Sequence, residues 1–492
     1  MNGPARRSVA LLAAAIFLFF LAVVSGDNFV DPDLYHLLAL IREALRIGHI
    51  PIEDRFAYTP TVHPCIHHEW GTGALLYAAT SAFGAGGILA WKYALAALLG
   101  GTVFAVHRRE STPIAVVALL APAAIVLVAS GFSTLRAQVF TLLFVALLML
   151  FLDRDRRGER GWILPWLLLH VVWVNLHAGF VVGTILFGLH AVEQRLRGAR
   201  VGHLVATLAA MALLVLANPY GWTYVPALLR AVTLDRSIVT EWDPIWKDAP
   251  AVVAVFAGAL ALAAYGGLRG GWRNAPGALL VLAAACGACL HQRHASIFGV
   301  VWICLVPRWI ARTPLAAVSS FRPRFQLAAG VLVAAASAFV VVRREPWRLR
   351  VPANPGEEPD LRYPAGAVAY LAERRFEGNV MVPFTVGAFV SWELHPRVRV
   401  SFDSRLEAGY PPGAAAENRD FYAARDGWRA TLARYPTDAV LAPAESRIAG
   451  ALLADGAWSA SYRDDAYALF VRPGLSLDAV DRRGARIPAR FP

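Results

Sequence analysis

Long apolar stretches separated by short polar connections recur along most of the chain, roughly every 20 to 30 residues. An α-helix needs about 20 apolar residues to cross the hydrocarbon core of a bilayer, and each stretch approaches that length. The pattern therefore predicts a polytopic all-α membrane domain over residues 1–343. The predicted spans, about eleven in number, lie at 8–25, 88–106, 112–130, 136–152, 162–174, 178–193, 203–217, 251–267, 276–290, 295–311 and 325–342.

Arginine-rich connections indicate which side of the membrane each loop faces. Cytoplasmic loops carry an excess of basic residues, and the basic connections here are 108–109, 154–160, 195–200, 269–273 and 308–324. All of them fall inside, with the amino terminus, if residues 70–85 do not complete a crossing. The glycines of 84–87 are the predicted break where that segment turns back. The carboxyl terminus then lies outside.

The first outer loop, residues 26–69, contains a predicted amphipathic helix at Leu34–Ile47. Its apolar positions recur at helical spacing on one face, as in a segment that lies along a membrane surface. Gly48 follows as a C-terminal stop, and Pro51 comes shortly after it.

The composition changes beyond Arg343. Residues 344–360 are rich in proline and predict a linker. Residues 361–492 alternate helical and strand-like segments, which predicts a small extracytoplasmic α/β domain. Its predicted helices are 366–374, 418–433 and 445–453, its strands 379–383, 398–402 and 439–442, and its hairpin 458–471.

Composition and charge support membrane topology. The chain has 492 residues, is 57% hydrophobic, and has a mean hydropathy of +0.48. A net charge of +12 would suit a nucleic-acid partner, but the basic residues lie between the predicted spans. We therefore predict no nucleic-acid partner.

The first candidate for chemistry is the acidic pair Asp31 and Asp33, directly after the first span. Two carboxylates this close could share a divalent metal ion, or one could act as a base beside a phosphate. The alternative is a solvated loop in which Asp33 serves as the N-cap of the following helix, because Asp is a preferred cap residue. That alternative explains Asp33 and so favours Asp31 as the catalytic residue.

The layout of the chain resembles the GT-C superfamily, the integral-membrane glycosyltransferases that use polyprenyl-phosphate-linked sugars. The likeness rests on the first span, the acidic pair, the juxtamembrane helix 34–47, the cluster 67–70, many further spans and an outer tail domain. It also resembles a set of bacterial proteins whose pattern matches here at Asp31, Asp33, His36, Gly48, Pro51, Asp54, His68, Glu69 and Trp70. The resemblance implies inverting sugar transfer with a first-loop Asp as base or metal ligand, in a bacterial cytoplasmic membrane.

Further candidates lie at the predicted outer face. Glu69 is a second catalytic acid, with His68 beside it, although a polar interface anchored by Trp70 explains the same residues. Polar residues at the outer ends of spans are candidates for substrate and phosphate binding, since Arg binds phosphate bidentately. They are Arg136, His177, Arg293 and His294. Arginines there also reach lipid headgroups.

Three other segments have a structural explanation at least as good as a functional one. Glu241 and Asp243 lie in an outer loop and could face the site, but an ordinary acidic loop is the favoured interpretation of both. Asp403 and Arg405 follow a predicted strand, where either a binding site or a structural ion pair fits. Cys286 and Cys289 are expected to be small packing residues rather than metal ligands.

These observations predict a membrane glycosyltransferase that moves a sugar from a polyprenyl-phosphate donor to a lipid or cell-envelope acceptor at the outer face. The juxtamembrane helix would dock the lipid carrier, and the tail domain would help to recognise the acceptor. Two alternatives remain: a flippase for lipid-linked saccharides, and a GT-C-like protein of envelope assembly without catalysis. A flippase would carry more charged residues deep within its spans.

Overall fold

The computed structural model describes residues 3–24, 28–132, 135–232, 240–319, 323–358 and 361–491. The chain divides into two compact units, and each is described by itself. The helical unit comprises Met1–Asn28, Ile88–Gly221 and Arg236–Arg348. The mixed unit comprises Phe29–Gly87, Trp222–Asp235 and Leu349–Pro492.

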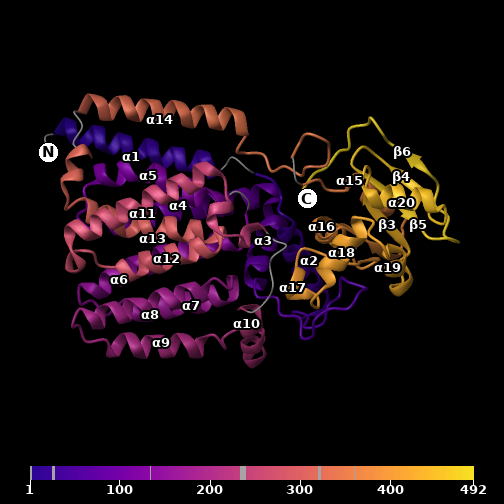
Figure 1. Ribbon diagram of the computed structural model, residues 1–492, viewed down its shortest axis with the longest axis horizontal. Coiled ribbons are helices and arrows are strands. Elements are labelled where there is room, and N and C mark those ends of the chain that lie inside the picture. The colour runs from indigo at the N-terminus through magenta and orange to yellow at the C-terminus, as the bar shows by residue number, and fades with distance from the viewer. Residues whose placement is uncertain are drawn as a thin grey trace. The chain divides into compact units, whose positions relative to one another are not determined.

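Every one of the eleven predicted spans lies on a helix. These helices are α1 (Gly3–Val24), α4 (Ala85–Glu110), α5 (Ile114–Ala129), α6 (Gln138–Arg156), α7 (Ile163–Leu176), α8 (Phe180–Leu196), α9 (Gly202–Leu214), α11 (Pro250–Gly270), α12 (Ala278–Leu290), α13 (Ala295–Ile310) and α14 (Pro323–Arg344). Although far apart in sequence, α1 and α14 lie side by side (Figure 1), and the Ser8 hydroxyl donates to Gln326 Oε1 at 2.8 Å.

Among the described residues, four helices are long and apolar enough to cross a membrane. They are Ala85–Glu110, Ile114–Phe132, Pro250–Gly270 and Arg324–Arg344. Shorter apolar helices in the helical unit are Ser8–Val24, Ile163–Leu176, Gly202–Leu214 and Ala278–Leu290. The protein is therefore embedded in a membrane, while the full count of eleven spans stays a prediction.

Helix α13 is the buried centre of the helical unit. All of its residues except Arg308 are buried, and it packs against α5, α6, α11 and α12. Backbones approach closely here, since a Cβ on Gly299 would stand 2.9 Å from Leu127 Cβ. The Trp302 indole N–H donates to the carbonyl of Ala259 at 2.9 Å. A helix that is apolar on every face is stable against lipid or among neighbouring helices, and α13 is covered by its neighbours.

The segment 70–85 forms a short helix, α3 (Trp70–Phe83), that ends at Gly84. Its 14 residues span about 21 Å, less than the roughly 30 Å hydrocarbon core. Gly84 takes a positive φ of 56°, and the chain then folds back so closely that a Cβ on Gly87 would lie 2.2 Å from the carbonyl oxygen of Ala79. The helix break therefore lies within the predicted glycine segment.

The mixed unit is built around a six-stranded sheet with strand order β2-β1-β3-β5-β4-β6. The pairs β1–β2, β1–β3 and β4–β6 are parallel, whereas β3–β5 and β4–β5 are antiparallel. The strands are β1 (Gly378–Met381), β2 (Val398–Val400), β3 (Ala439–Pro443), β4 (Ser459–Arg463), β5 (Tyr467–Val471) and β6 (Val480–Asp481). Its helices are α2 (Pro32–Ile47), α3, α10 (Tyr224–Val232), α15 (Ala365–Glu373), α16 (Phe384–Leu394), α17 (Leu406–Gly409), α18 (Ala414–Tyr422), α19 (Trp428–Arg434) and α20 (Arg447–Asp455).

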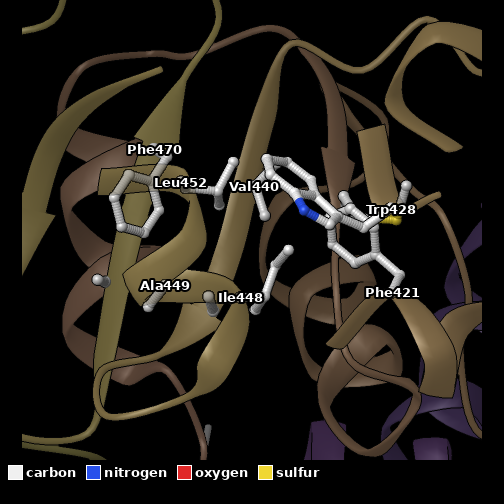
Figure 2. Packing of buried hydrophobic residues seen from close by; sticks show 10 residues of the cluster. Phe421, Trp428, Val440, Ile448, Ala449, Leu452 and Phe470 are labelled. Atoms are coloured by element: carbon white, nitrogen blue, oxygen red, sulfur yellow. The ribbon is translucent and has the colours of Figure 1, made fainter. Parts of the chain in front are cut away.

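The sequence-predicted strands and hairpin of the tail are present, but the single helix predicted at 418–433 is wrong. Gly427 has a φ of 92° in the left-handed region and separates α18 from α19. One core cluster packs these helices and α20 against β1, β3 and β5, with Phe421 and Trp428 meeting at its edge (Figure 2).

The first loop and the tail belong to the same unit. Val400 of β2 donates its N–H to Phe56 O at 2.9 Å, and Tyr58 N–H donates to Val400 O at 3.1 Å. The loop thereby continues the sheet beyond β2, which would otherwise be an open edge. Val30 N–H also donates to Arg350 O at 3.0 Å. Residues more than 300 positions apart are thus held by backbone hydrogen bonds.

The turn at Gly84–Gly87 yields a test with a neighbouring control. We expect Gly87→Ala to lower the thermal unfolding midpoint of the purified protein, because the new methyl group meets the Ala79 carbonyl. Gly86→Ala should leave the midpoint unchanged or raise it, since nothing lies within 4 Å of a Cβ there and Ala favours helix. Equal midpoints for the two variants would contradict this packing.

Candidate active site

The acidic pair opens helix α2. Asp31 is the N-cap, with extended backbone, and its Oδ1 accepts the N–H of Asp33 at 2.9 Å. Pro32 occupies the first helical position and has no N–H, so the first amide available to a cap is that of Asp33. The prediction that Asp33 is the cap is therefore wrong. Because Asp31 is the cap, capping explains Asp31 and no longer explains Asp33. Asp33 is therefore the favoured catalytic residue.

One side of α2 brings the candidates of the mixed unit together. Asp33 and His36 are three residues apart and so share a helix face. The His36 ring stacks on His67, with centroids 5.5 Å apart, and a Cβ on Gly73 of α3 would lie 3.0 Å from Leu37 O. The segment that carries His68 and Glu69 therefore begins beside His36 and leads into α3, which packs on Leu37 and Ile41 of α2. His68 Nε2 is 3.4 Å from Glu69 Oε1.

The stacked histidines are neutral. Burial lowers the pKa of His36 well below its ordinary value, and the positive charge of Arg405 lowers it further. Burial also lowers the pKa of His67, and its neighbour His36 adds to that effect. Two protonated imidazoles stacked at this distance would repel each other, and little water is present to solvate them. The pair acts as an uncharged polar spacer between α2 and the segment before α3.

A buried charge cluster joins the loop to the tail. Arg405 is 6% exposed and binds Asp403 through two nitrogens, Nη2 to Oδ2 at 2.6 Å and Nε to Oδ1 at 2.8 Å. It also pairs with Asp54 of the first loop, whose Oδ1 accepts the amides of Phe56 and Ala57. Of the two interpretations of Asp403 and Arg405, the structure supports the ion pair.

Asp54 remains ionised in this setting. Burial is the largest influence and would raise the pKa of its carboxyl, but the charge and hydrogen bond of Arg405, together with the Ala57 amide, lower that pKa overall. Two carboxylates share one guanidinium here, so the three residues carry one net negative charge. Such a cluster persists in the interior only because every oxygen has hydrogen-bond donors.

The predicted phosphate-binding residues of the helical unit gather around two short 3₁₀ segments, η3 (Thr240–Trp242) and η6 (Gln292–His294). Arg136 forms an ion pair with Glu241. The Arg293 guanidinium lies over the Trp242 ring, 4.7 Å from its centroid, and the ring of His294 lies 6.3 Å from that of Trp242. The structure thus brings Arg136, Arg293 and His294 together.

Glu241 and Trp242 are functional candidates that the sequence reasoning missed. Glu241 was favoured as an ordinary loop residue, yet it pairs with a predicted phosphate ligand. Burial would raise the pKa of Glu241, but Arg136 and Arg293 lower it, so the carboxylate stays charged. The signal in the sequence was an arginine at a span end, which needs a nearby acid once it is partly buried.

The net charge of this group depends on His294, Arg136, Arg293 and Glu241. Burial lowers the pKa of His294 to about 4, helped by Arg293, so this imidazole is neutral at pH 7. The guanidinium groups of Arg136 and Arg293 both lie close enough to Glu241 to lower the pKa of its carboxyl. The group Arg136, Arg293 and Glu241 carries one net positive charge, which suits an anion such as a phosphate.

His177, the C-cap residue of α7, belongs to a hydrogen-bond network with Thr141 of α6. The indole N–H of Trp173 donates to Thr141 Oγ1 at 3.0 Å, and the Thr141 hydroxyl contacts His177 Nδ1 at 2.7 Å. Gly179 N–H also donates to Nδ1 at 3.1 Å. Because Nδ1 accepts, the ring proton of the neutral imidazole lies on Nε2, which makes that nitrogen a donor. Thr141 lies three residues after Gln138, whose Nε2 donates to Arg293 O at 3.3 Å.

The metal predicted at Asp31 and Asp33 has an incomplete set of ligands in the described ranges. No group of three or more His, Cys, Asp or Glu side chains stands together there in a way that could hold a metal ion. The pair itself offers two carboxylates, and one of them already accepts a helix amide. A divalent ion with only these two protein ligands would depend on water and substrate oxygens.

No family model matches the chain, and no curated protein sequence matches it. Solved structures are similar to it at low identity. The archaeal oligosaccharyltransferase AglB from Archaeoglobus fulgidus, in complex with an inhibitory peptide and a dolichol-phosphate, has a TM-score of 0.57 and 12% identity, over 89% of this chain and 69% of that one. ArnT from Cupriavidus metallidurans, bound to undecaprenyl phosphate, has a TM-score of 0.53 and 11% identity, over 94% and 97%. The arabinofuranosyltransferase AftD from Mycobacteria has a TM-score of 0.54 and 15% identity, over 96% of this chain and 40% of its own.

These similarities establish the fold. The three neighbours are an oligosaccharyltransferase and two further proteins of the GT-C type, and the likeness to each extends over almost the whole of this chain. The resemblance to the GT-C superfamily found in the sequence is confirmed at the level of the fold.

The buried ion cluster predicts a strong dependence on Arg405. We expect Arg405→Met to lower the local free energy of unfolding of β1 and β2 by about 3–5 kcal/mol, because two buried carboxylates lose their counter-charge. Asp54→Asn should cost about 1 kcal/mol, since an amide oxygen still accepts the Phe56 and Ala57 amides. Hydrogen exchange of the strand amides measures both.

The matched control is Arg472→Met. Arg472 also forms an ion pair in this unit, with Asp438 at 2.7 Å, but it is 50% exposed and should contribute less than about 1 kcal/mol. If Arg405→Met and Arg472→Met lower the free energy of unfolding by similar amounts, burial does not explain the contribution of Arg405 to stability.

The stacked histidines predict a pH dependence. Their pKa values are lowered in the folded protein, so the unfolded chain binds more protons below about pH 6.5. Stability is complete above that pH and falls with acidification, by about 1.4 kcal/mol per pH unit for each histidine. The lowered pKa of Asp54 contributes only below about pH 4, outside this window. Thermal unfolding between pH 7 and pH 5.5 measures the slope.

Removing both imidazoles should reduce this slope. We expect the double variant His36→Leu/His67→Leu to unfold with a weaker pH dependence than the parent protein. His63→Leu, at an exposed histidine of the same loop, should keep the parent slope. An unchanged slope in the double variant would contradict the assignment.

Proposed function

We propose that this chain is a membrane glycosyltransferase that transfers a sugar from a polyprenyl-phosphate donor to a lipid or cell-envelope acceptor. The observation that supports it most is the GT-C fold, shared over nearly the full length with ArnT. The AglB and ArnT structures contain dolichol-phosphate and undecaprenyl phosphate, respectively. A polyprenyl-phosphate carrier is the donor class that this fold suggests for the present chain.

The proposed reaction is an inverting displacement at the outer face of the membrane. The acceptor hydroxyl attacks the anomeric carbon, and the bond from that carbon to the phosphate oxygen breaks with its electron pair on the phosphate. Asp33 takes the proton of the hydroxyl as general base. Asp31 holds the first turn of α2 through the cap bond, so the orientation of Asp33 depends on it.

The leaving polyprenyl phosphate carries the developing negative charge. In the helical unit, Arg136 and Arg293 carry guanidinium groups of the kind that bind the phosphate of a polyprenyl carrier, and Glu241 forms an ion pair with Arg136. Donors already fixed before reaction stabilise charge with little reorganisation. His294 and His177 are neutral hydrogen-bonding groups of the same helical unit, and the latter carries its proton on Nε2.

Glu69 and His68 form a second polar pair, between His67, which stacks on His36 of α2, and helix α3. A carboxylate 3.4 Å from an imidazole nitrogen orients the ring and favours one tautomer. We assign this pair to the acceptor, as hydrogen-bonding partners of its hydroxyl groups. A metal ion is not required for any step of this proposal.

The function is tested by separate carboxylate-to-amide changes. We expect Asp33→Asn to lower sugar transfer from a polyprenyl-phosphate sugar by about 10²- to 10⁴-fold, the usual contribution of a general base. Asp31→Asn should lose less than about tenfold, because Asn is also a good N-cap and keeps the bond to Asp33 N–H. Product formation is followed with radiolabelled donor in lipid vesicles.

Glu53→Gln is the control, since Glu53 is an exposed acid of the same loop and should keep parental turnover. Equal thermal unfolding midpoints exclude misfolding as the cause of a loss. Full turnover in both Asp variants would refute the enzymatic proposal. Donor movement across the vesicle without transfer would indicate a flippase instead.

A further inference from the structure

The mixed unit contains a cavity of about 550 Å³ away from the acidic pair. It lies among Thr59 and Pro60 of the first loop, helices α18 and α19, and the segment that begins at Pro411. Phe421 and Trp428, whose rings pack together in the core (Figure 2), form its apolar wall. The volume lies in the range of small-molecule sites in proteins.

The polar wall of the cavity is held in place by its own hydrogen bonds. Arg434 Nη1 donates to Glu417 Oε1 at 2.9 Å, and the Tyr435 hydroxyl donates to Glu417 Oε2 at 3.0 Å. Arg425 Nη1 lies 3.0 Å from Asp420 Oδ1. Asn418 is anchored by its amide, which donates to Val382 O at 2.9 Å. These planar groups are therefore oriented before any ligand arrives.

The charges of the lining point to an uncharged ligand. Three carboxylates, those of Glu417, Asp420 and Asp426, stand with the two guanidinium groups of Arg425 and Arg434. Such a cavity has no excess positive charge for a phosphate, in contrast to the group around Arg136 and Arg293. A lipid chain would remove water from these charged side chains and offer them no hydrogen bonds in return, at a high cost.

The geometry points to a saccharide-binding site at this cavity, for a neutral di- or trisaccharide. Carboxylate and guanidinium groups each offer two parallel hydrogen bonds, which match the adjacent hydroxyl groups of a sugar ring. The exposed prolines of the lining, Pro60 and Pro412, offer apolar surface to the less polar faces of the sugar. Its role as the subsite that holds an acceptor glycan rests on the proposed function, whereas saccharide binding itself does not.

The site is tested by binding rather than by activity. The full chain in detergent micelles is titrated with neutral disaccharides (maltose, cellobiose and mannobiose) and with glucose 1-phosphate, and saturation-transfer NMR detects contact. We expect at least one neutral disaccharide to bind with a Kd of about 1–10 mM, and glucose 1-phosphate to bind at least about tenfold more weakly. No binding of any neutral disaccharide at about 50 mM would overturn the proposal.

Variants locate the site. Glu417→Gln removes a charged acceptor and should weaken binding by about tenfold, and Thr431→Trp should abolish it by filling the cavity. Arg483→Gln is the control, because Arg483 is about as exposed as Arg434 (59% against 63%) but pairs with Asp481, and neither Arg483 nor Asp481 lines the cavity. Binding unaffected by both cavity variants would refute the location. If the parent protein binds a disaccharide but transfers no sugar from a polyprenyl-phosphate donor, the proposed function is refuted and the saccharide site is not.

Discussion

The mixed unit depends on the burial of one guanidinium group, that of Arg405. A buried cation is tolerated only with counter-charges and hydrogen bonds, and here the tail supplies one carboxylate and the first loop supplies the other. The loop must therefore fold onto the tail for the charge to be satisfied. The sheet then gains the loop as a neighbour of β2, and α2 leads into this loop with its amino-terminal turn fixed by Asp31.

In the helical unit, too, partly buried charged side chains have partners within the protein. Arg136 and Arg293 lie at the ends of apolar helices, where a free guanidinium would be costly. Arg136 forms an ion pair with Glu241, and the guanidinium of Arg293 lies over the Trp242 ring. The charges of Arg136, Arg293 and Glu241 sum to one positive charge. A group assembled in this way is rigid before the substrate arrives, which is the condition for electrostatic stabilisation of a leaving phosphate. The segment η6, which contains Arg293, leads directly into the buried, apolar helix α13.

The acidic pair shows how a small backbone fact changes a chemical assignment. Both aspartates are good N-caps by composition, and Asp33 was expected to be the cap because it directly precedes the predicted helix. Pro32 decides the matter, because its missing N–H moves the first available amide to residue 33. Asp31 becomes the residue that orients, and Asp33 the candidate that reacts. This division also explains why an amide at position 31 is expected to be tolerated.

The sequence by itself determined the apolar helices, the amphipathic α2, the break near Gly84 and most strands of the tail. Each depends on short-range periodicity, glycine or proline, which act over a few residues and are therefore visible in the chain. It also supplied the GT-C resemblance and most of the candidate site. Only the tertiary structure decided which charges meet: Asp54 with Arg405 across 351 positions, and Arg136 with Glu241 across 105. It also divided the predicted helix 418–433, where Gly427 takes a left-handed conformation at the edge of the cavity. Ion pairing depends on distance in space, and a single sequence carries no record of that distance.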